Sequence, residues 1–578
     1  MEYSKLSGAL AAASEQYTER GRQTLGTHSK LLGLVTVTEP ARPARAVVFV
    51  RGTDAKALDR LQYDGLEVNE GTGTVRTGIV EFEALDAVTA DPALSQLVVA
   101  HRLRTLMDVA PGKVGVPAFV KDTHLDGTGV VVGIVDTGID SQHPAFQGRI
   151  ERVWDQTLHG KGVPEGRYGV ELKGDRLIES HDEHGHGTHV AGIASGADAK
   201  FPGIAPKARL VIVKTDLMDP HIADGVRYCF RVAAQLGLPA VVNLSLGGHA
   251  DPHDGTDPMS EIIDQESGPG RIVVCAAGNE GNDAIHAAAT LPKGGTRSLA
   301  CLATGPFEIN AWYSGQDEME VSVVGPSGSA TPFQKIITNG SPVRKYVLAD
   351  GTVQIATPGA DPVNHDHQVV VVAEPSAFGG VAPSRTWRIR FRGVKIGKGR
   401  VDAWVLSNDE APSLFSGRYV EDAIKVGSPG CATDAMTAAA YTTKNTWKDI
   451  DGNTRHVGFD VDDIADFSSE GPRRDGHQKP DVTTPGAMIA ASMSRDADFD
   501  RGFVLDTRHV MLAGTSMASP FLAGVVALLL QRDKTLEPAK LRQRLISASA
   551  VPGGKEAAFD RQWGYGLLSV DHLGSQSA

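Results

Sequence analysis

The chain has 578 residues, of which 41% are hydrophobic and 22% are charged, and its formal net charge is −13. This acidic balance disfavours nucleic acid or an anionic membrane surface as the main partner. No run approaches the roughly 20 consecutive apolar residues that a membrane span needs. The length exceeds what one simple core accommodates and predicts about three or four domains.

The amino-terminal stretch MEYSKLSGALAAASEQYTERGR has no basic start followed by an apolar core, so the sequence predicts no secretory signal. The cysteines are widely separated and show no C-x-x-C spacing, so neither a zinc site nor a disulfide framework is expected. They are Cys229, Cys275, Cys301 and Cys431. Both observations favour a cytoplasmic location, with a secreted protein as the alternative.

The first predicted elements lie after the linker-like TEPARPAR. A small α+β unit is expected, with strands in ARAVVFVRG, TVRTGIVEF and LSQLVVAHRL and helices in DAKALDRLQY and ALDAVTADPAL. From about residue 127, near-continuous apolar strands such as VVVGIVD alternate with helices. That alternation indicates a parallel sheet covered by helices on both faces.

The helices disappear between about 285 and 425, where segments such as HQVVVVAE and TWRIRFRG are separated by Gly, Pro, Asn and Asp. This pattern is typical of an antiparallel β-sandwich. Trp312, Trp387 and Trp404 are expected to form the core of the sandwich. The α/β pattern resumes afterwards, so the sandwich is predicted to be an insertion.

We therefore predict an α/β fold with an α+β amino-terminal domain and an inserted antiparallel β-sandwich. The segments are 1–43, helical or linker; 44–110, the α+β domain; 111–284 and 426–578, the two parts of the α/β domain; and 285–425, the sandwich.

Three side chains are of the types that serine acyl transfer needs: a nucleophile, a base and a carboxylate that orients the base. Asp136 ends the strand VVVGIVD, at the carboxyl edge where ligands bind in open α/β sheets. His186 opens the helix HGTHVAGIA, and Ser516 precedes the apolar helix FLAGVVALLLQR. Ser516 alone could equally be a helix N-cap. Asn279, in CAAGNEG, could donate to an oxyanion or simply form a turn.

Five segments taken together resemble the motifs of the subtilisin-like serine peptidases. They are GIVDTGIDSQHP, HGHGTHVAGI, VVNLSLGG, VVCAAGNEG and MLAGTSMASPFLAGVVALL, in the order of the family. The resemblance implies a serine endopeptidase with Ser516 as nucleophile, His186 as general base and Asp136 as its orienting carboxylate. It implies an oxyanion hole from the Asn279 side chain and the Ser516 N–H.

The resemblance extends to substrate binding and to the added domains. Ser245, Leu246 and Gly247 are expected to form an edge that pairs with the backbone of a polypeptide substrate. The segment 44–110 resembles a subtilase propeptide, an intramolecular inhibitor that is cut off within 104–115; the alternative is a permanent accessory domain. The sandwich is similar to the jelly-roll insert of some bacterial members.

No metal ligand is predicted, and no cofactor is required by this chemistry. The histidines of HDEHGHGTH do not follow H-E-x-x-H spacing, and structural calcium in KDIDGNTRH or FDVDDIAD is the one cofactor left open. Two other functions remain in view. One is a pseudoprotease that binds peptides or proteins without cutting them, and the other is a glycan-binding role for the sandwich.

Overall fold

The computed structural model describes most of the chain and falls into two compact units. The described residues are 1–20, 34–35, 43–61, 63–101, 104–105, 112–337, 339–376, 385–407, 412–554 and 558–574. One unit comprises 1–102, 249–252 and 283–422, and the other comprises 103–248, 253–282 and 423–578. Among the described helices, none combines the length and the hydrophobicity that crossing a bilayer requires.

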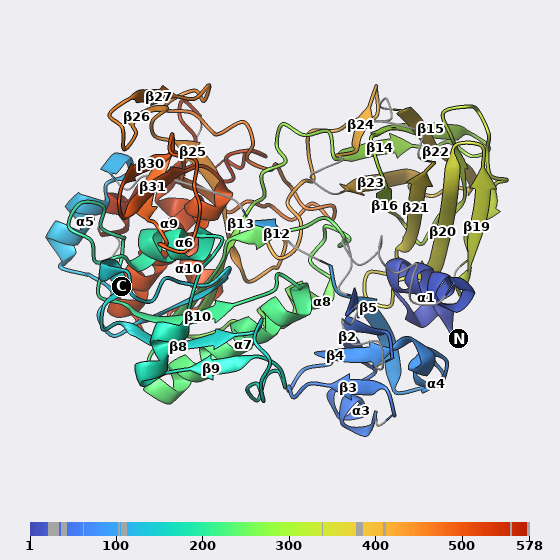
Figure 1. The fold of residues 1–578 in the computed structure, drawn as a ribbon. Coiled ribbons are helices and arrows are strands. Elements are labelled where there is room, and N and C mark those ends of the chain that lie inside the picture. Colours follow the sequence, from blue (N-terminus) through green and yellow to red (C-terminus); the bar gives the residue numbers. More distant parts are fainter. Residues whose placement is uncertain are drawn as a thin grey trace. The chain divides into compact units, whose positions relative to one another are not determined.

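The larger unit is built on a ten-stranded sheet whose central strands are parallel (Figure 1). In spatial order the strands are β32 (Ser549–Ala550), β33 (Leu567–Leu568), β28 (Val482–Ala487), β25 (Met436–Thr442), β13 (Arg271–Ala276), β11 (Ala240–Leu244), β7 (Val131–Asp136), β10 (Arg209–Lys214), β8 (Ile150–Asp155) and β9 (Val170–Leu172). Strand β13 comes before the sandwich in the sequence and β25 comes after it, yet the two strands pair directly. The predicted insertion into one parallel sheet is therefore confirmed.

Helices cover both faces of this sheet. Helices α6 (His186–Ser195) and α9 (Thr515–Arg532) share a hydrophobic core with Val132 and Ile134 of β7. On the opposite face a Cβ at Gly133 would lie 2.9 Å from Cys229 Sγ of α7 (Asp219–Leu236). Because side chains alternate along a strand, Asp136 faces the same side as α6. The remaining helices of this unit are α5 (Val116–Thr123), α8 (Pro258–Glu266) and α10 (Pro538–Ser547).

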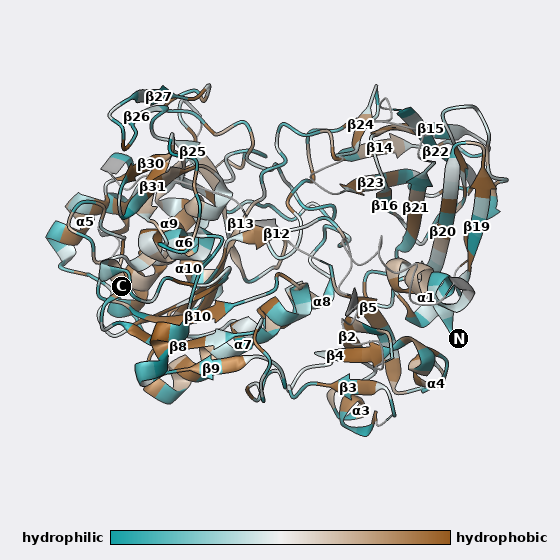
Figure 2. Ribbon diagram, in the orientation of Figure 1, coloured by the Kyte–Doolittle hydropathy of each residue, from teal (hydrophilic) through white to brown (hydrophobic). Residues whose placement is uncertain are grey.

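The central strands form because their apolar runs have no polar face to present to water. All six residues of β7 are buried, and β10 appears largely brown in the hydropathy colouring of Figure 2. Two further small antiparallel groups belong to this unit. They are β26 (Thr446–Lys448) with β27 (Thr454–His456), and β29 (Ile489–Ser492), β31 (His509–Leu512) and β30 (Val504–Asp506).

The smaller unit begins with the predicted α+β fold, an antiparallel sheet flanked by short helices. Its strands are β1 (Leu34–Val35), β2 (Arg45–Gly52), β4 (Val75–Glu81), β3 (Leu66–Val68) and β5 (Leu94–Val99), and its helices are α1 (Gly8–Arg20), α3 (Ala55–Arg60) and α4 (Leu85–Thr89). The Asp54 carboxylate caps α3 by accepting from the Ala57 N–H at 2.8 Å. Strand β3 was not among the predicted elements.

The same unit contains two antiparallel sheets between residues 286 and 416, as the sandwich prediction requires. One consists of β14 (His286–Thr290), β23 (Arg400–Ser407), β16 (Phe307–Tyr313), β21 (His367–Pro375), β20 (Gly351–Ala360) and β19 (Ser341–Leu348). The other consists of β18 (Gln334–Lys335), β17 (Glu318–Val324), β22 (Arg385–Lys395), β15 (Thr296–Ala303) and β24 (Leu414–Ser416). Whether the strands follow a jelly-roll order stays a prediction.

All three sandwich tryptophans are buried, but only one lies between the sheets. Trp387 of β22 meets Phe307 of β16 edge-on, at 6.0 Å between ring centroids. Alternation along β16 places Trp312 on the face opposite to Phe307, and Trp404 is paired with Asn310 on that same outer face of the six-stranded sheet. There Trp312 donates to Asn310, and Trp404 stacks on His286. The prediction that all three form the sandwich core was therefore wrong for two of them.

Candidate active site

Strand β7 and helix α6 bring a carboxylate and an imidazole together in a dry environment. Both Asp136 and His186 are completely buried, and His186 Nδ1 lies 2.7 Å from Asp136 Oδ1. The same carboxylate oxygen accepts the Thr137 N–H at 2.7 Å, which fixes the carboxylate orientation. With Nδ1 donating to Asp136, the neutral imidazole carries its lone pair on Nε2.

Close backbone approach places His186 at this distance. Gly185, the N-cap of α6, has a φ of 83°, a conformation that favours glycine. A Cβ on Gly187 would lie 2.3 Å from the carbonyl oxygen of Gly138, in the turn that follows β7. The small residues that open α6 therefore allow the helix to approach the turn after Asp136.

Asp182 is a buried side chain that sequence analysis missed. Its carboxylate accepts four hydrogen bonds of 2.7–2.8 Å, from the Gly185 N–H, the Thr137 hydroxyl, and the N–H and hydroxyl of Thr188. The Thr137 hydroxyl in turn accepts the Gly187 N–H at 2.9 Å. Asp182 therefore joins the start of α6 to the residue after Asp136. An acid four positions before a helix start is the one sequence signal that could have indicated this role.

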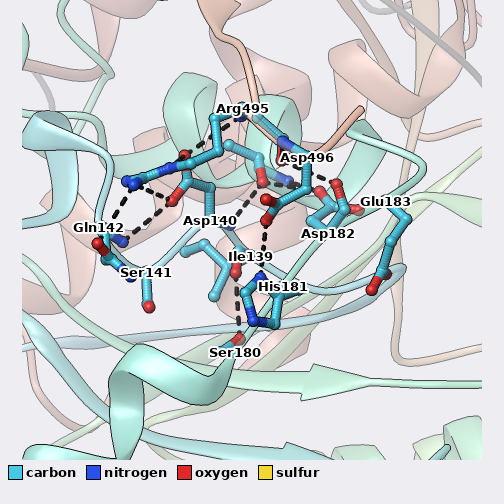
Figure 3. Close-up of polar contacts among 12 residues, drawn as sticks. Ile139, Asp140, Ser141, Gln142, Ser180, His181, Asp182, Glu183, Arg495 and Asp496 are labelled. Atoms are coloured by element: carbon cyan, nitrogen blue, oxygen red, sulfur yellow. Dashed lines mark hydrogen bonds and ion pairs between the residues drawn. The ribbon is translucent and has the colours of Figure 1, made fainter. Parts of the chain in front are cut away.

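The loops around Asp182 are tied together by further polar contacts (Figure 3). His181 Nδ1 lies 3.0 Å from an Asp496 carboxylate oxygen, and the Arg495 guanidinium pairs with Asp140 at 3.0 Å. The Ser494 hydroxyl donates to the Asp182 carbonyl at 2.8 Å. The segment 494–496 thus holds the loop that leads into His186.

Ser516 is the second residue of α9, and it does not cap the helix. The N-cap position is Gly514, which makes no side-chain capping bond. The buried Ser516 hydroxyl donates instead to the Ser245 carbonyl at 2.8 Å. The capping interpretation of this hydroxyl is therefore wrong.

Ser245 also compensates for the proline within α9. Pro520 has no N–H, so the Ser516 carbonyl loses its intrahelical donor four residues on. The Ser245 hydroxyl donates to that carbonyl at 2.6 Å, and Asn243 donates to the Ser245 hydroxyl at 2.9 Å. Ser519 completes the buried chain by donating to Asn243 at 2.7 Å. This chain fixes the Ser516 carbonyl and the helical turn that follows it.

Asn279 follows β13, and its side-chain amide has a defined orientation. Its Oδ1 accepts both the N–H and the hydroxyl of Thr515, each at 2.9 Å. The Nδ2 group therefore points away from Thr515 and can donate to another acceptor. Since Thr515 immediately precedes Ser516, this donor lies beside the Ser516 backbone.

The edge formed by Ser245, Leu246 and Gly247 already carries a strand of this chain. Strand β12 (Leu246–Gly247) pairs antiparallel with β6 (Arg104–Thr105), with Leu246 opposite Thr105 and Gly247 opposite Arg104. Part of the predicted cleavage region, 106–111, lies outside the described residues.

The groups considered as metal ligands have other partners. The His189 ring is buried, which lowers its pKa to about 3, and its Nε2 lies 3.3 Å from the Val510 carbonyl. Asp449, in KDIDGNTRH, accepts two N–H groups of its own turn and pairs with Arg455 at 2.7 Å. Asp462, in FDVDDIAD, pairs with Lys113. Calcium binding by these loops stays a prediction. All four cysteines are buried, and none of them forms a disulfide within the described residues.

Known proteins resemble this chain over most of its length. The serine protease AprX of Bacillus subtilis is 22% identical over 439 residues, which cover 73% of this chain and 61% of that protein. The PI-type proteinase of Lactococcus lactis subsp. cremoris is 24% identical over 70% of this chain, and the match spans only 22% of that longer relative. These relatives give no support to a cytoplasmic location, which stays a prediction.

The fold is shared with a solved protease structure. The CspB protease of Clostridium perfringens aligns with a TM-score of 0.66 and 22% identity, over 79% of this chain and 95% of that one. A family model described as the subtilase family matches residues 127–364 and 404–566. Because that model covers more than half of the chain, the chain belongs to the subtilase family.

Proposed function

We propose that this subtilase is a serine endopeptidase that hydrolyses polypeptides through an acyl-enzyme. The observation that carries the proposal is the buried 2.7 Å contact between His186 and Asp136, which leaves Nε2 as the proton acceptor. Ser516 is the nucleophile. For attack, its hydroxyl redirects its proton from the Ser245 carbonyl to Nε2 of His186.

The attack produces an imidazolium and an oxyanion, and each of these charges needs a stabilising group. Removal of the Ser516 proton makes His186 an imidazolium, which the buried Asp136 carboxylate stabilises without taking the proton. The oxyanion of the tetrahedral intermediate accepts from Asn279 Nδ2 and from the Ser516 N–H at the start of α9. His186 then protonates the leaving amine, and water hydrolyses the ester by the same steps.

The substrate is a polypeptide bound in extended form along Ser245, Leu246 and Gly247. The antiparallel pairing of Arg104–Thr105 with β12 supports this proposal, because a segment of extended backbone lies along Leu246–Gly247 there. We also propose that the segment ending at Arg104–Thr105 acts as an intramolecular inhibitor, since it occupies the same edge. The chemistry requires no cofactor.

Hydrolysis of an unfolded protein such as casein tests the proposal, with each chain cut between Thr105 and Gly112 and separated from its N-terminal segment, because that segment is proposed to inhibit the enzyme. We expect new amino termini to appear with the parent chain, and Ser516→Ala to lower kcat by at least about 10⁴-fold. Ser547→Ala, at an exposed serine of α10 outside the proposed site, is the matched control and should retain activity. Equal hydrolysis by the parent and Ser516→Ala would refute the proposal, and no hydrolysis by either would favour the pseudoprotease.

A further inference from the structure

We propose that the inserted sandwich is the docking surface that retains the N-terminal segment after that segment has been cut from the rest of the chain. The inference rests on the proposed function, because it assigns the sandwich a part in holding the inhibitor. It begins from the composition of the smaller unit, in which residues 1–102 and 283–422 form one compact body.

Helix α1 is buried on both sides, which its sequence alone does not predict. Leu10 and Ala13 belong to the core of the α+β domain, whereas Ala12 packs with Ala356 and Val370 of the six-stranded sheet. Figure 1 shows α1 between β5 and the ends of β20 and β21. A helix buried all round lies between two layers, and here the second layer is the sandwich.

The approach of helix and sheet is close at one residue. A Cβ on Gly8 would lie 2.6 Å from Cγ2 of Val370 and 3.0 Å from its Cβ. Val370 is β-branched and lies within a sheet, so it has little freedom to move aside. Glycine at position 8 therefore allows the helix to lie against the sandwich surface. Helix propensity alone would favour alanine at this position.

Buried amide groups add directional contacts to this apolar interface. Gln16 donates to Gln354 of β20 at 2.5 Å, and both side chains are about 95% buried. Gln96 of β5 donates to Asp361 at 3.2 Å. Loss of the N-terminal segment would leave these amides and carboxylates with altered partners, as well as exposing apolar surface.

The same sheet face also holds the loop that follows the substrate edge. Gln368 accepts the Gly8 N–H at 3.3 Å and donates to Asn310 at 3.0 Å. Asn310 donates to the carbonyls of His249 (3.1 Å) and Asp251 (2.9 Å), which come directly after Leu246–Gly247 in the chain. One hydrogen-bonded face therefore contacts both the helix and the loop that leaves β12.

Retention on the sandwich would strengthen inhibition without tighter binding at the active site. The strand Arg104–Thr105 offers two residues to β12, which is a weak attachment for a cut segment. A second attachment through α1 keeps the cut segment on the same molecule as β12, so that its rebinding to the edge is intramolecular. Cutting alone would then leave the enzyme inhibited, and release of α1 would be the activating step.

The test separates retention from catalysis by using Ser516→Ala. A recognition sequence for an unrelated site-specific protease is inserted between Thr105 and Gly112, the chain is cut, and release of the N-terminal fragment is measured by native mass spectrometry over a dilution series. We expect the fragment to stay bound at micromolar concentration. Gly8→Ala should raise its dissociation constant at least tenfold, and adding Val370→Ala should bring the constant back toward the parent value.

Thr18→Ala is the matched control, since Thr18 is exposed on the same helix, and it should leave the dissociation constant unchanged. Circular dichroism of each uncut chain verifies folding. Release of the parent fragment at micromolar concentration would overturn the inference. A Gly8→Ala fragment that binds as tightly as the control would also overturn the inference, because the added methyl group would then not contact the sandwich. Neither result depends on an active serine.

Discussion

Asn279, the proposed oxyanion donor, has a side-chain amide held in one orientation. Thr515 holds its carbonyl oxygen with two hydrogen bonds, and its amide nitrogen remains available beside Ser516. We expect Asn279→Ala to lower kcat by about 10²–10³ while KM changes little, as for the corresponding donor of subtilisin. Steady-state kinetics on a peptide substrate would check this value.

The control for Asn279 retains the acceptor and removes the donor. Asn279→Asp has nearly the same shape and still accepts from Thr515, but it replaces the donor by a negative charge. If the oxyanion forms beside this side chain, the loss in kcat should therefore exceed that of Asn279→Ala. A rise in KM alone, with kcat unchanged in either variant, would rule out selective transition-state stabilisation by this group.

Residue types and spacing predicted Asp136, His186, Asn279 and Ser516, because their chemistry is carried by recognisable motifs. The supporting contacts of Asp182 and Ser245 could not be predicted in the same way. The role of Asp182 depends on hydrogen bonds from four groups. Ser245 donates a hydrogen bond to the Ser516 carbonyl, which has no intrahelical donor because residue 520 is proline. These partners lie far away in sequence or are backbone atoms, which a sequence does not distinguish.

Helix α6 determines the separation of imidazole and carboxylate. Gly187 contacts the turn after β7 so closely that an added methyl group would overlap the Gly138 carbonyl. We expect Gly187→Ala to move α6 outward, to destabilise the protein by about 1–3 kcal/mol, and to lower kcat at least tenfold by lengthening the His186–Asp136 contact.

Thermal unfolding and kcat measured together would check this expectation. Gly458→Ala is the matched control, because a Cβ there meets nothing within 4 Å and the residue is exposed. Unchanged kcat and stability in Gly187→Ala would show that the close approach has no importance for the site.

Element prediction succeeded where hydrophobic patterning was strong and failed where it was absent. The apolar strands of the parallel sheet and the alternating strands of the sandwich were predicted close to their observed bounds. Helix α1 gave no sign of its burial, because its small alanines are compatible with either side of a helix. For Trp312 and Trp404, alternation indicates which residues share a face and not which face is the inner one.

At the scale of the molecule, the sheet strands that come before the sandwich in the sequence share one hydrophobic core with those that come after it. A buried charge cluster lies after the sandwich in the sequence. The Asp481 carboxylate pairs with Lys479 at 2.7 Å and with Arg542 of α10 at 2.7 Å. Burial alone raises the pKa of Asp481, but these two cations outweigh it and lower the pKa to about 2.

This depressed pKa predicts acid lability of the larger unit. Folding keeps Asp481 ionised, so its stabilisation is complete above the unfolded pKa of about 3.9 and is lost as the pH falls toward 2. The loss amounts to about 2–3 kcal/mol of unfolding free energy. Urea unfolding between pH 5 and pH 2.5 would measure it.

Asp481→Asn is the informative variant for this cluster. It should be destabilised by about 3–5 kcal/mol at neutral pH, because it leaves Lys479 as an uncompensated buried cation, and its stability should fall less steeply in acid. A variant as stable as the parent at pH 7, with the same acid profile, would contradict the assignment.

The most direct test of the central claim is the intact mass of the chain after treatment with a fluorophosphonate. The proposed mechanism predicts one adduct per parent chain and none on Ser516→Ala. Since the N-terminal segment occupies the substrate edge, the measurement should include the chain cut between Thr105 and Gly112 and carrying Gly8→Ala, in which labelling should be faster. No adduct on either form would contradict an activated Ser516.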